Sequence, residues 1–187
     1  AIHSIIDGYT REAGVRTLER TFAKVMRKAA VKITEGYTGK ISVKPTGLEA
    51  YLGPKKYKPE SQGHKDEVGV VNGLAWTSVG GEMLKVEAVK MPGTGKLELT
   101  GSLGDVMKES ARTAYSYIRS ISEALPLDMD FYKNTDIHIH FPEGAVPKDG
   151  PSAGIAITTA VVSALTGIPV RADIAMTGEV TLTGNVL

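Results

Sequence analysis

The amino-acid sequence predicts an α+β protein in which a small helical part is followed by a part that contains a β-sheet. Three observations lead to this prediction. The first third of the chain has helix-like apolar periodicity, residues 54–67 are polar and interrupted by Pro and Gly, and the remainder alternates strand-like segments with helices. We therefore divide the chain into a helical part (residues 1–53), a linker (54–67) and a sheet-containing part (68–187).

The helical part is expected to contain two helices within residues 1–35, separated by a turn near Gly14. The second helix is amphipathic, with basic residues on one side. Its other side carries apolar residues at three- and four-residue spacing, namely Leu18, Phe22, Val25, Met26, Ala29 and Ile33. A brief strand over residues 40–44 and a short helix that ends at Leu52 complete this part.

Four segments of the second part have strand character: residues 68–77, 83–90, 96–100 and 136–141. In the last two, apolar and polar residues alternate, which is typical of a strand with one buried face. A further strand is expected within residues 172–182.

Two helices are expected between these strands. The first covers residues 105–122, and its buried stripe is predicted to contain Val106, Ser110, Ala114, Tyr117 and Ile121. The second covers residues 152–166, where small apolar residues are nearly continuous, so this helix should be buried. It should end at Gly167, because Gly is a common helix stop.

The composition excludes several classes of function. Lys and Arg number 22 against 21 Asp and Glu, so the formal net charge of +1 does not indicate nucleic acid or a membrane surface as the main partner. No apolar run is long enough to span a bilayer, and the first residues lack a secretion-signal pattern. The absence of Cys excludes a thiolate nucleophile and cysteine-bound zinc. The chain therefore reads as a soluble intracellular protein.

The strongest chemical signal is the segment 147–154, Pro-Lys-Asp-Gly-Pro-Ser-Ala-Gly, which leads directly into the second helix. Its Gly and Pro residues fix a tight backbone path around Ser152. A hydroxyl beside the unpaired N–H groups of a helix N-terminus is well placed for acyl transfer, because those donors stabilise an oxyanion. The alternative is that Ser152 only caps the helix.

Other site hypotheses fit the sequence less well. Residues 150–154 match the G-x-S-x-G elbow of α/β-hydrolases, but that family needs a His after the serine, and none of the four His residues follows Ser152. A triad in the order His, Asp, Ser, from His138 or His140 with Asp149 and Ser152, remains open. The two His residues could chelate a metal, but no third ligand is evident. Residues 93–96 resemble the end of a phosphate-binding loop yet lack its first Gly and its Ser or Thr, and a hairpin turn is the better interpretation.

The segment 147–154 resembles the signature around the nucleophile of Lon proteases. The resemblance extends to residues 73–77 with 80–81, 99–110, 136–140 with 142–145, and 176–179. Upstream, residues 9–16 resemble the small helical lid of that family's AAA+ ATPase module. The resemblance thus covers nearly the whole chain and implies a partial lid followed by a mixed-sheet proteolytic domain.

The resemblance implies a Ser–Lys dyad, with Ser152 as the nucleophile. The lysine would lie shortly after Leu187, so the proteolytic domain is expected to be incomplete and the 187 residues weakly active or inactive. Such a lysine must be neutral near pH 7, so its pKa must fall well below the usual value of about 10.4. Lys148 is close to Ser152, but a lysine in a Pro/Gly loop is expected to be solvated.

The resemblance also implies roles for other residues. Thr177 matches a residue beside the lysine, and Asp149 and Glu179 match residues that line the same site, although all could be ordinary polar loop residues. Arg16 matches an arginine that senses bound nucleotide. Trp76 lies near the strand expected to hold extended substrate by edge pairing, with a core tryptophan as the alternative.

For the intact protein, the resemblance implies ATP and Mg²⁺ as cofactors, polypeptides as substrates, and a homo-hexamer in the bacterial cytoplasm or an organelle matrix. No cofactor or metal is expected in the 187 residues themselves, and nucleic acid is not implied as a partner. A non-catalytic assembly module that shares this fold and serves another ATPase is the alternative function.

Overall fold

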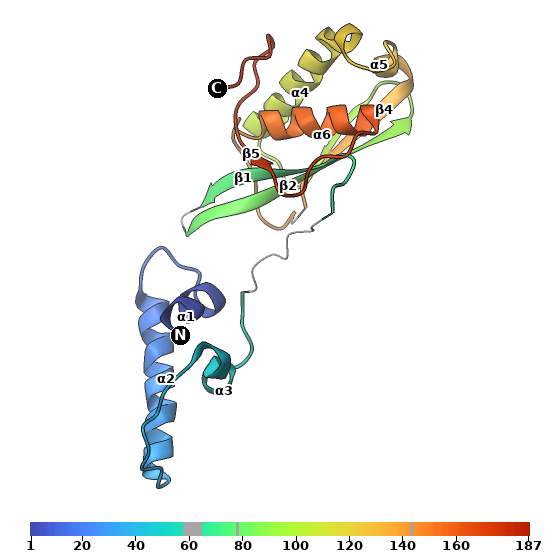
Figure 1. Ribbon diagram of the computed structural model, residues 1–187. Coiled ribbons are helices and arrows are strands. Elements are labelled where there is room, and N and C mark those ends of the chain that lie inside the picture. Colours follow the sequence, from blue (N-terminus) through green and yellow to red (C-terminus); the bar gives the residue numbers. More distant parts are fainter. Residues whose placement is uncertain (58–64, 78, 143) are drawn as a thin grey trace. The chain divides into compact units, whose positions relative to one another are not determined.

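The computed structural model describes residues 1–57, 65–77, 79–142 and 144–187. The chain divides into two compact units, a helical unit of residues 1–61 with 78–80 and a sheet unit of residues 62–77 with 81–187 (Figure 1). Half of the predicted linker, residues 58–64, lies outside the described residues. No helix in the described ranges is both long and apolar enough to cross a membrane.

The helical unit contains α1 (Ile2–Tyr9), α2 (Arg16–Thr34), the 3₁₀ turn η1 (Pro45–Gly47) and α3 (Leu48–Leu52). Its core is formed by Ile5, Tyr9 and Leu48, against which Leu18 and Phe22 of α2 pack. The Tyr9 hydroxyl donates to the carbonyl of Gly53 (2.8 Å), which ties α1 to the end of α3.

Two predictions for this unit need correction. Residues 40–44 form no strand, since the described residues of this unit supply no neighbouring strand for them to pair with. On α2, Val25 is buried, whereas Met26 and Ile33 are exposed by 65% and 59%. The apolar face of α2 is therefore covered only along its first half.

The sheet unit holds five strands in the order β3-β4-β2-β1-β5. The strands are β1 (Val70–Thr77), β2 (Gly80–Pro92), β3 (Leu97–Thr100), β4 (Thr135–His140) and β5 (Ala175–Met176). β2 and β4 are antiparallel, whereas β3 is parallel to β4 and β5 is parallel to β1. The sheet is mixed and the fold is α+β, as predicted. Residues 93–96 form a turn between β2 and β3 but not a hairpin, because β4 lies between those two strands.

Helices α4 (Asp105–Ser120) and α6 (Gly154–Thr166) pack against each other, and α6 packs on β1 and β4 (Figure 1). Two short elements, η2 (Ser122–Ala124) and α5 (Phe131–Asn134), connect α4 to β4. The core joins apolar residues from the strands and the end of β4 with apolar residues, many of them Ala, from the two helices: Val71, Val86, Ile137, Ile139, Phe141, Ala111, Ala114, Ile118, Ala156, Ile157, Ala160 and Val161. The prediction of a buried α6 is confirmed, and the helix ends at Gly167 with φ 75°.

The buried stripe of α4 differs from the predicted one. It consists of Met107, Ser110, Ala111, Ala114, Tyr115 and Ile118, whereas Val106 is exposed. The predicted stripe advanced mostly by four residues at a time, and such steps drift around a helix that has 3.6 residues per turn. Only Ser110 and Ala114 belong to both stripes.

Candidate active site

Ser152 lies in a turn two residues before α6, and it is exposed to solvent. α6 begins at Gly154 with Ala153 as its N-cap, and no side chain caps it by a hydrogen bond. In the described part of the chain, the Ser152 hydroxyl has no hydrogen-bond partner. The alternative in which Ser152 only caps the helix is therefore wrong, and the helix starts two residues later than predicted.

Of the four backbone amides from Ser152 to Ile155, the last two are already hydrogen-bonded and the first two are available to a developing negative charge. The N–H of Gly154 donates to the Pro151 carbonyl (3.1 Å), and that of Ile155 donates to the Gly178 carbonyl (3.0 Å). The N–H groups of Ser152 and Ala153 have no acceptor among the residues that the structure describes. The open donors thus lie just before the helix rather than in its first turn. Such donors beside a nucleophile can form an oxyanion hole.

Helix α4 holds the segment that leads to Ser152. The N–H of Gly104 donates to the Lys148 carbonyl (2.7 Å), and the N–H of Lys148 donates to the Ser102 carbonyl (3.0 Å). The buried Ser110 hydroxyl donates to the Pro151 carbonyl (3.1 Å), directly before Ser152. Sequence reasoning placed Ser110 on the α4 stripe but missed this contact, because nothing in the sequence pairs positions 41 residues apart.

Asp149 acts on the backbone of this region. Its carboxylate accepts hydrogen bonds from the N–H groups of Gly150 (2.9 Å) and Met107 (3.0 Å). These two donors hold the pKa of the Asp149 carboxyl below its usual value, so it is ionised at neutral pH. Met107 lies in the first turn of α4, so Asp149 caps that helix from a distant loop. Gly104 makes room for it, because a Cβ there would collide with the carboxylate.

The segment after β5 closes the site from the other side. The N–H of Gly178 donates to the Ser152 carbonyl (2.7 Å), and the Thr177 hydroxyl lies 3.4 Å from the same oxygen. Thr177 therefore lies beside Ser152, whereas its predicted place beside a lysine stays a prediction. Glu179 follows directly, and its exposed side chain has no partner in the described ranges. Its backbone is paired with Leu187 by two hydrogen bonds (3.1 and 2.9 Å).

The last Gly of the motif 147–154 is explained by packing. A Cβ on Gly154 would lie 2.7 Å from the backbone N of Val180 and 3.3 Å from the Gly178 carbonyl oxygen. The 2.7 Å distance is too short for a real Cβ atom, and the 3.3 Å distance is tight. The absence of a side chain at position 154 therefore lets the start of α6 approach the segment that binds Ser152.

Trp76 is not a core residue. It is 86% exposed on β1, which excludes the alternative of a buried tryptophan. β5 pairs with β1 only at Asn72 and Gly73. The residues of β1 after Gly73 thus extend past the end of β5. Beyond that end of β5 the chain continues to Thr177 and Gly178, which contact the Ser152 carbonyl.

The histidines do not form a triad with Ser152. His138 Nε2 and His140 Nδ1 lie 2.8 and 2.7 Å from the Thr100 hydroxyl, and His138 Nδ1 lies 3.8 Å from a Glu98 carboxylate oxygen. Asp149 is bonded to backbone amides instead. The His-Asp-Ser alternative is therefore wrong. Within the described ranges, no three His, Asp or Glu side chains are arranged to hold a metal ion.

Arg16 is the first residue of α2 in the helical unit and is exposed. Its side chain has no hydrogen bond or ion pair with another described residue. Its role in nucleotide sensing stays a prediction.

Comparison with known proteins agrees with the motifs. Residues 40–187 match the family model of the Lon protease (S16) C-terminal proteolytic domain, and residues 1–41 match that of the Lon protease AAA+ ATPase lid domain. Proteins named Lon protease are similar to the whole chain, with 60% identity in Finegoldia magna, 57% in Aquifex aeolicus and 54% in Clostridium acetobutylicum. The chain spans only 24%, 23% and 24% of these relatives. The resemblance seen in the sequence is thus confirmed, and the chain belongs to the Lon protease family.

Proposed function

We propose that this chain is the proteolytic part of an ATP-dependent serine endopeptidase that hydrolyses peptide bonds of unfolded or damaged proteins. The observation that carries the proposal is the exposed hydroxyl of Ser152, which has no hydrogen-bond partner among the described residues, as is also true of the N–H groups of Ser152 and Ala153. α4 fixes one side of this turn, and residues 177–178 fix the other.

In the proposed reaction, Ser152 Oγ forms a bond to the carbonyl carbon of the substrate. The carbonyl oxygen becomes negative and accepts hydrogen bonds from the N–H groups of Ser152 and Ala153. A neutral amine takes the hydroxyl proton and passes it to the leaving amine of the broken peptide bond. Water then hydrolyses the acyl-enzyme and frees Ser152.

We propose that the amine belongs to a lysine in residues that follow Leu187 in a longer protein. Leu187 is paired with Glu179, two residues from Thr177. A continuing chain would therefore start close to the turn that carries Ser152. Lys148 is a poor candidate, because its ammonium group donates to the carbonyl of Val146 (3.2 Å).

Edge pairing offers a mode of substrate binding. The part of β1 that extends past β5, with the exposed Trp76, can add an extended polypeptide as a further strand. An unfolded chain presents many such segments, whereas a folded protein presents few.

The remaining proposals concern the longer protein. The 187 residues contain no complete phosphate-binding loop, so ATP and Mg²⁺ would be held elsewhere, with the exposed Arg16 of the lid available to contact phosphate. ATP would supply the energy for unfolding. We place the protein as a homo-hexamer in the bacterial cytoplasm, which is consistent with the bacterial sources of the relatives.

A fluorophosphonate probe, which labels activated serines, tests the proposal. The 187-residue chain and a version extended past Leu187 are compared, each with a Ser152→Ala variant. We expect strong labelling only in the extended chain with Ser152 present. Labelling that survives Ser152→Ala would overturn the assignment of the nucleophile. An extended chain that folds but is not labelled would favour the non-catalytic assembly module.

A further inference from the structure

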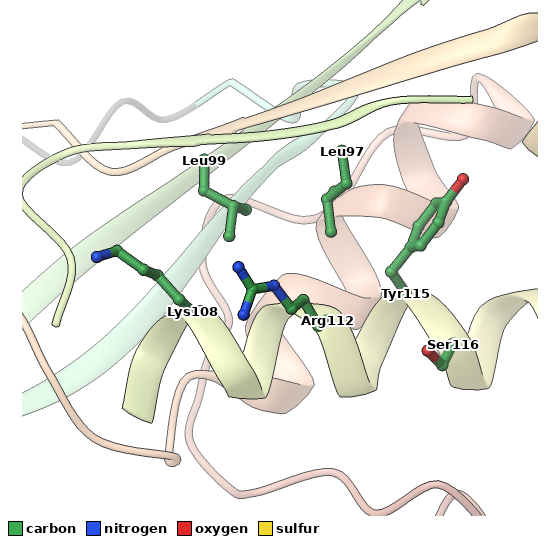
Figure 2. A pocket seen from close by; sticks show the side chains of 6 residues that line it. All are labelled: Leu97, Leu99, Lys108, Arg112, Tyr115 and Ser116. Carbon is green, nitrogen blue, oxygen red and sulfur yellow. The ribbon is translucent and has the colours of Figure 1, made fainter. Parts of the chain in front are cut away.

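A separate cleft lies on the sheet unit between β3 and α4, and its lining includes no residue of the Ser152 turn. It has a volume of about 470 Å³ and is lined by Leu97, Leu99, Lys108, Arg112, Tyr115 and Ser116. Figure 2 shows Leu97 and Leu99 extending from β3 toward α4, while Lys108 and Arg112 rise from α4 toward the strand. The cleft thus has one apolar wall and one basic wall.

The strand beside this cleft is an open edge of the sheet. β3 pairs with β4 and has no second neighbour among the described strands. The carbonyls of Lys96 and Thr100 accept hydrogen bonds from β4. In a parallel ladder the groups that bond to one neighbour belong to alternate residues. The main-chain N–H and C=O groups of Leu97 and Leu99 therefore point outward, away from β4.

The charges around the cleft favour an acidic ligand. Arg112 has no carboxylate partner in the described part of the chain. Lys108 lies 3.3 Å from the fully exposed Asp105 and is also close enough to Asp149 to help lower the pKa of that carboxyl, so Arg112 is the less neutralised of the two cations. The nearest acid on β3, Glu98, is directed to the opposite face of the sheet, toward His138. A strand added at about 4.8 Å from β3 would place every second side chain on the side of α4.

We propose that the β3 edge and this cleft together bind an extended peptide segment that carries acidic side chains at alternating positions. The main chain of the peptide pairs with Leu97 and Leu99, and its acidic side chains lie toward Lys108 and Arg112. Strand addition of this kind takes its affinity from the main chain and its specificity from alternate side chains. The inference does not depend on the proposed proteolytic function.

The test uses the 187-residue chain with Ser152→Ala, so that no peptide is cut, and fluorescence polarisation of short, terminally blocked, labelled peptides. A peptide in which Glu alternates with Val should bind with a Kd on the order of 100 µM, because the interface is small. The same peptide with Lys in place of Glu should not bind. Equal binding of both peptides would overturn the proposal, as would the absence of any binding.

N-methylation separates strand addition from simple charge attraction. Two further peptides carry N-methyl groups on the Glu residues only or on the Val residues only. The N–H groups that bond to one neighbouring strand belong to alternate residues of the peptide. One of these peptides should therefore bind like the parent, and the other should lose binding. If both bind like the parent, no strand is added and the proposal fails.

The location of binding is tested by variants and by amide NMR. Arg112→Glu should raise the Kd of the acidic peptide about tenfold, because the substitution replaces an electrostatic attraction by a repulsion. The control Arg27→Glu, an exposed arginine on α2, should leave binding unchanged. Peptide-induced shifts should be largest at the amides of Leu97 and Leu99. Shifts confined to β1 around Trp76 would assign the peptide to the substrate edge and overturn the proposal.

Discussion

Two polar clusters of the sheet unit differ in whether their hydroxyl group is already bonded. Thr100 lies between His138 and His140, so this cluster contains the residue types that many serine hydrolases use. Among the described residues, the Ser152 hydroxyl has no hydrogen bond to a histidine, a carboxylate or any other group, and the two amides of Ser152 and Ala153 also have no acceptor there. The comparison teaches that familiar catalytic residue types can lie together without an available hydroxyl, and that a hydroxyl with open donors beside it is the better reason to propose Ser152 as the nucleophile.

The largest expected effect, on the rate of peptide hydrolysis, comes from removing the Ser152 hydroxyl and, for comparison, the Thr100 hydroxyl. In a chain extended past Leu187, Ser152→Ala should reduce peptide hydrolysis about 10⁴-fold or more. Thr100→Val should leave the rate within about twofold, since the Thr100 hydroxyl takes no part in the proposed reaction. Peptidase assays on both variants make the measurement. A Thr100→Val protein that is folded but inactive would contradict the assignment.

The packing beneath the nucleophile can be broken at Gly154. In an isolated helix Gly→Ala is stabilising by about 1 kcal/mol. Here the added Cβ would press on the backbone of Val180 and Gly178, so Gly154→Ala should instead destabilise the sheet unit by about 2 kcal/mol. Urea unfolding measures the difference.

Gly81→Ala provides the matched control, because a Cβ there meets nothing within 4 Å. It should change the free energy of unfolding by less than about 0.5 kcal/mol. A stabilising effect of Gly154→Ala would show that the start of α6 is not packed as described.

The bond between Ser110 and Pro151 connects α4 to the nucleophile turn. Ser110→Ala should cost about 1 kcal/mol, because the Pro151 carbonyl loses a buried donor. It should also slow labelling of Ser152 severalfold in the extended chain, as the turn loses a constraint. The exposed Ser116, one residue past Tyr115 on the same helix, gives the control Ser116→Ala, which should change neither quantity. Unchanged labelling in Ser110→Ala would limit Ser110 to a structural role.

Local patterns predicted much of the fold but little of the contact network. The alternation over residues 136–141 and the small apolar run before Gly167 correctly gave β4 and α6. The strand order could not be predicted, because the placement of β4 between β2 and β3 depends on packing across many residues. The contacts of Asp149 with α4 and of Gly178 with Ser152 join positions 42 and 26 residues apart, and each residue alone looks like an ordinary loop residue. The motif therefore pointed to Ser152 as a candidate, while the contacts that hold its turn became visible only in three dimensions.

The smallest expected effect concerns the charge of Asp149, whose carboxylate binds backbone amides near Ser152. Its folded pKa is depressed by the N–H groups of Gly150 and Met107. A depressed pKa adds stability that is complete above the unfolded pKa of about 3.9 and is lost as the pH falls through the folded pKa. Asp149→Asn should therefore lower the melting temperature at pH 7, and the gap to the unmodified chain should shrink steadily below pH of about 4. Melting curves across this range make the measurement, and a gap that stays constant would show that charge on Asp149 does not stabilise the start of α4.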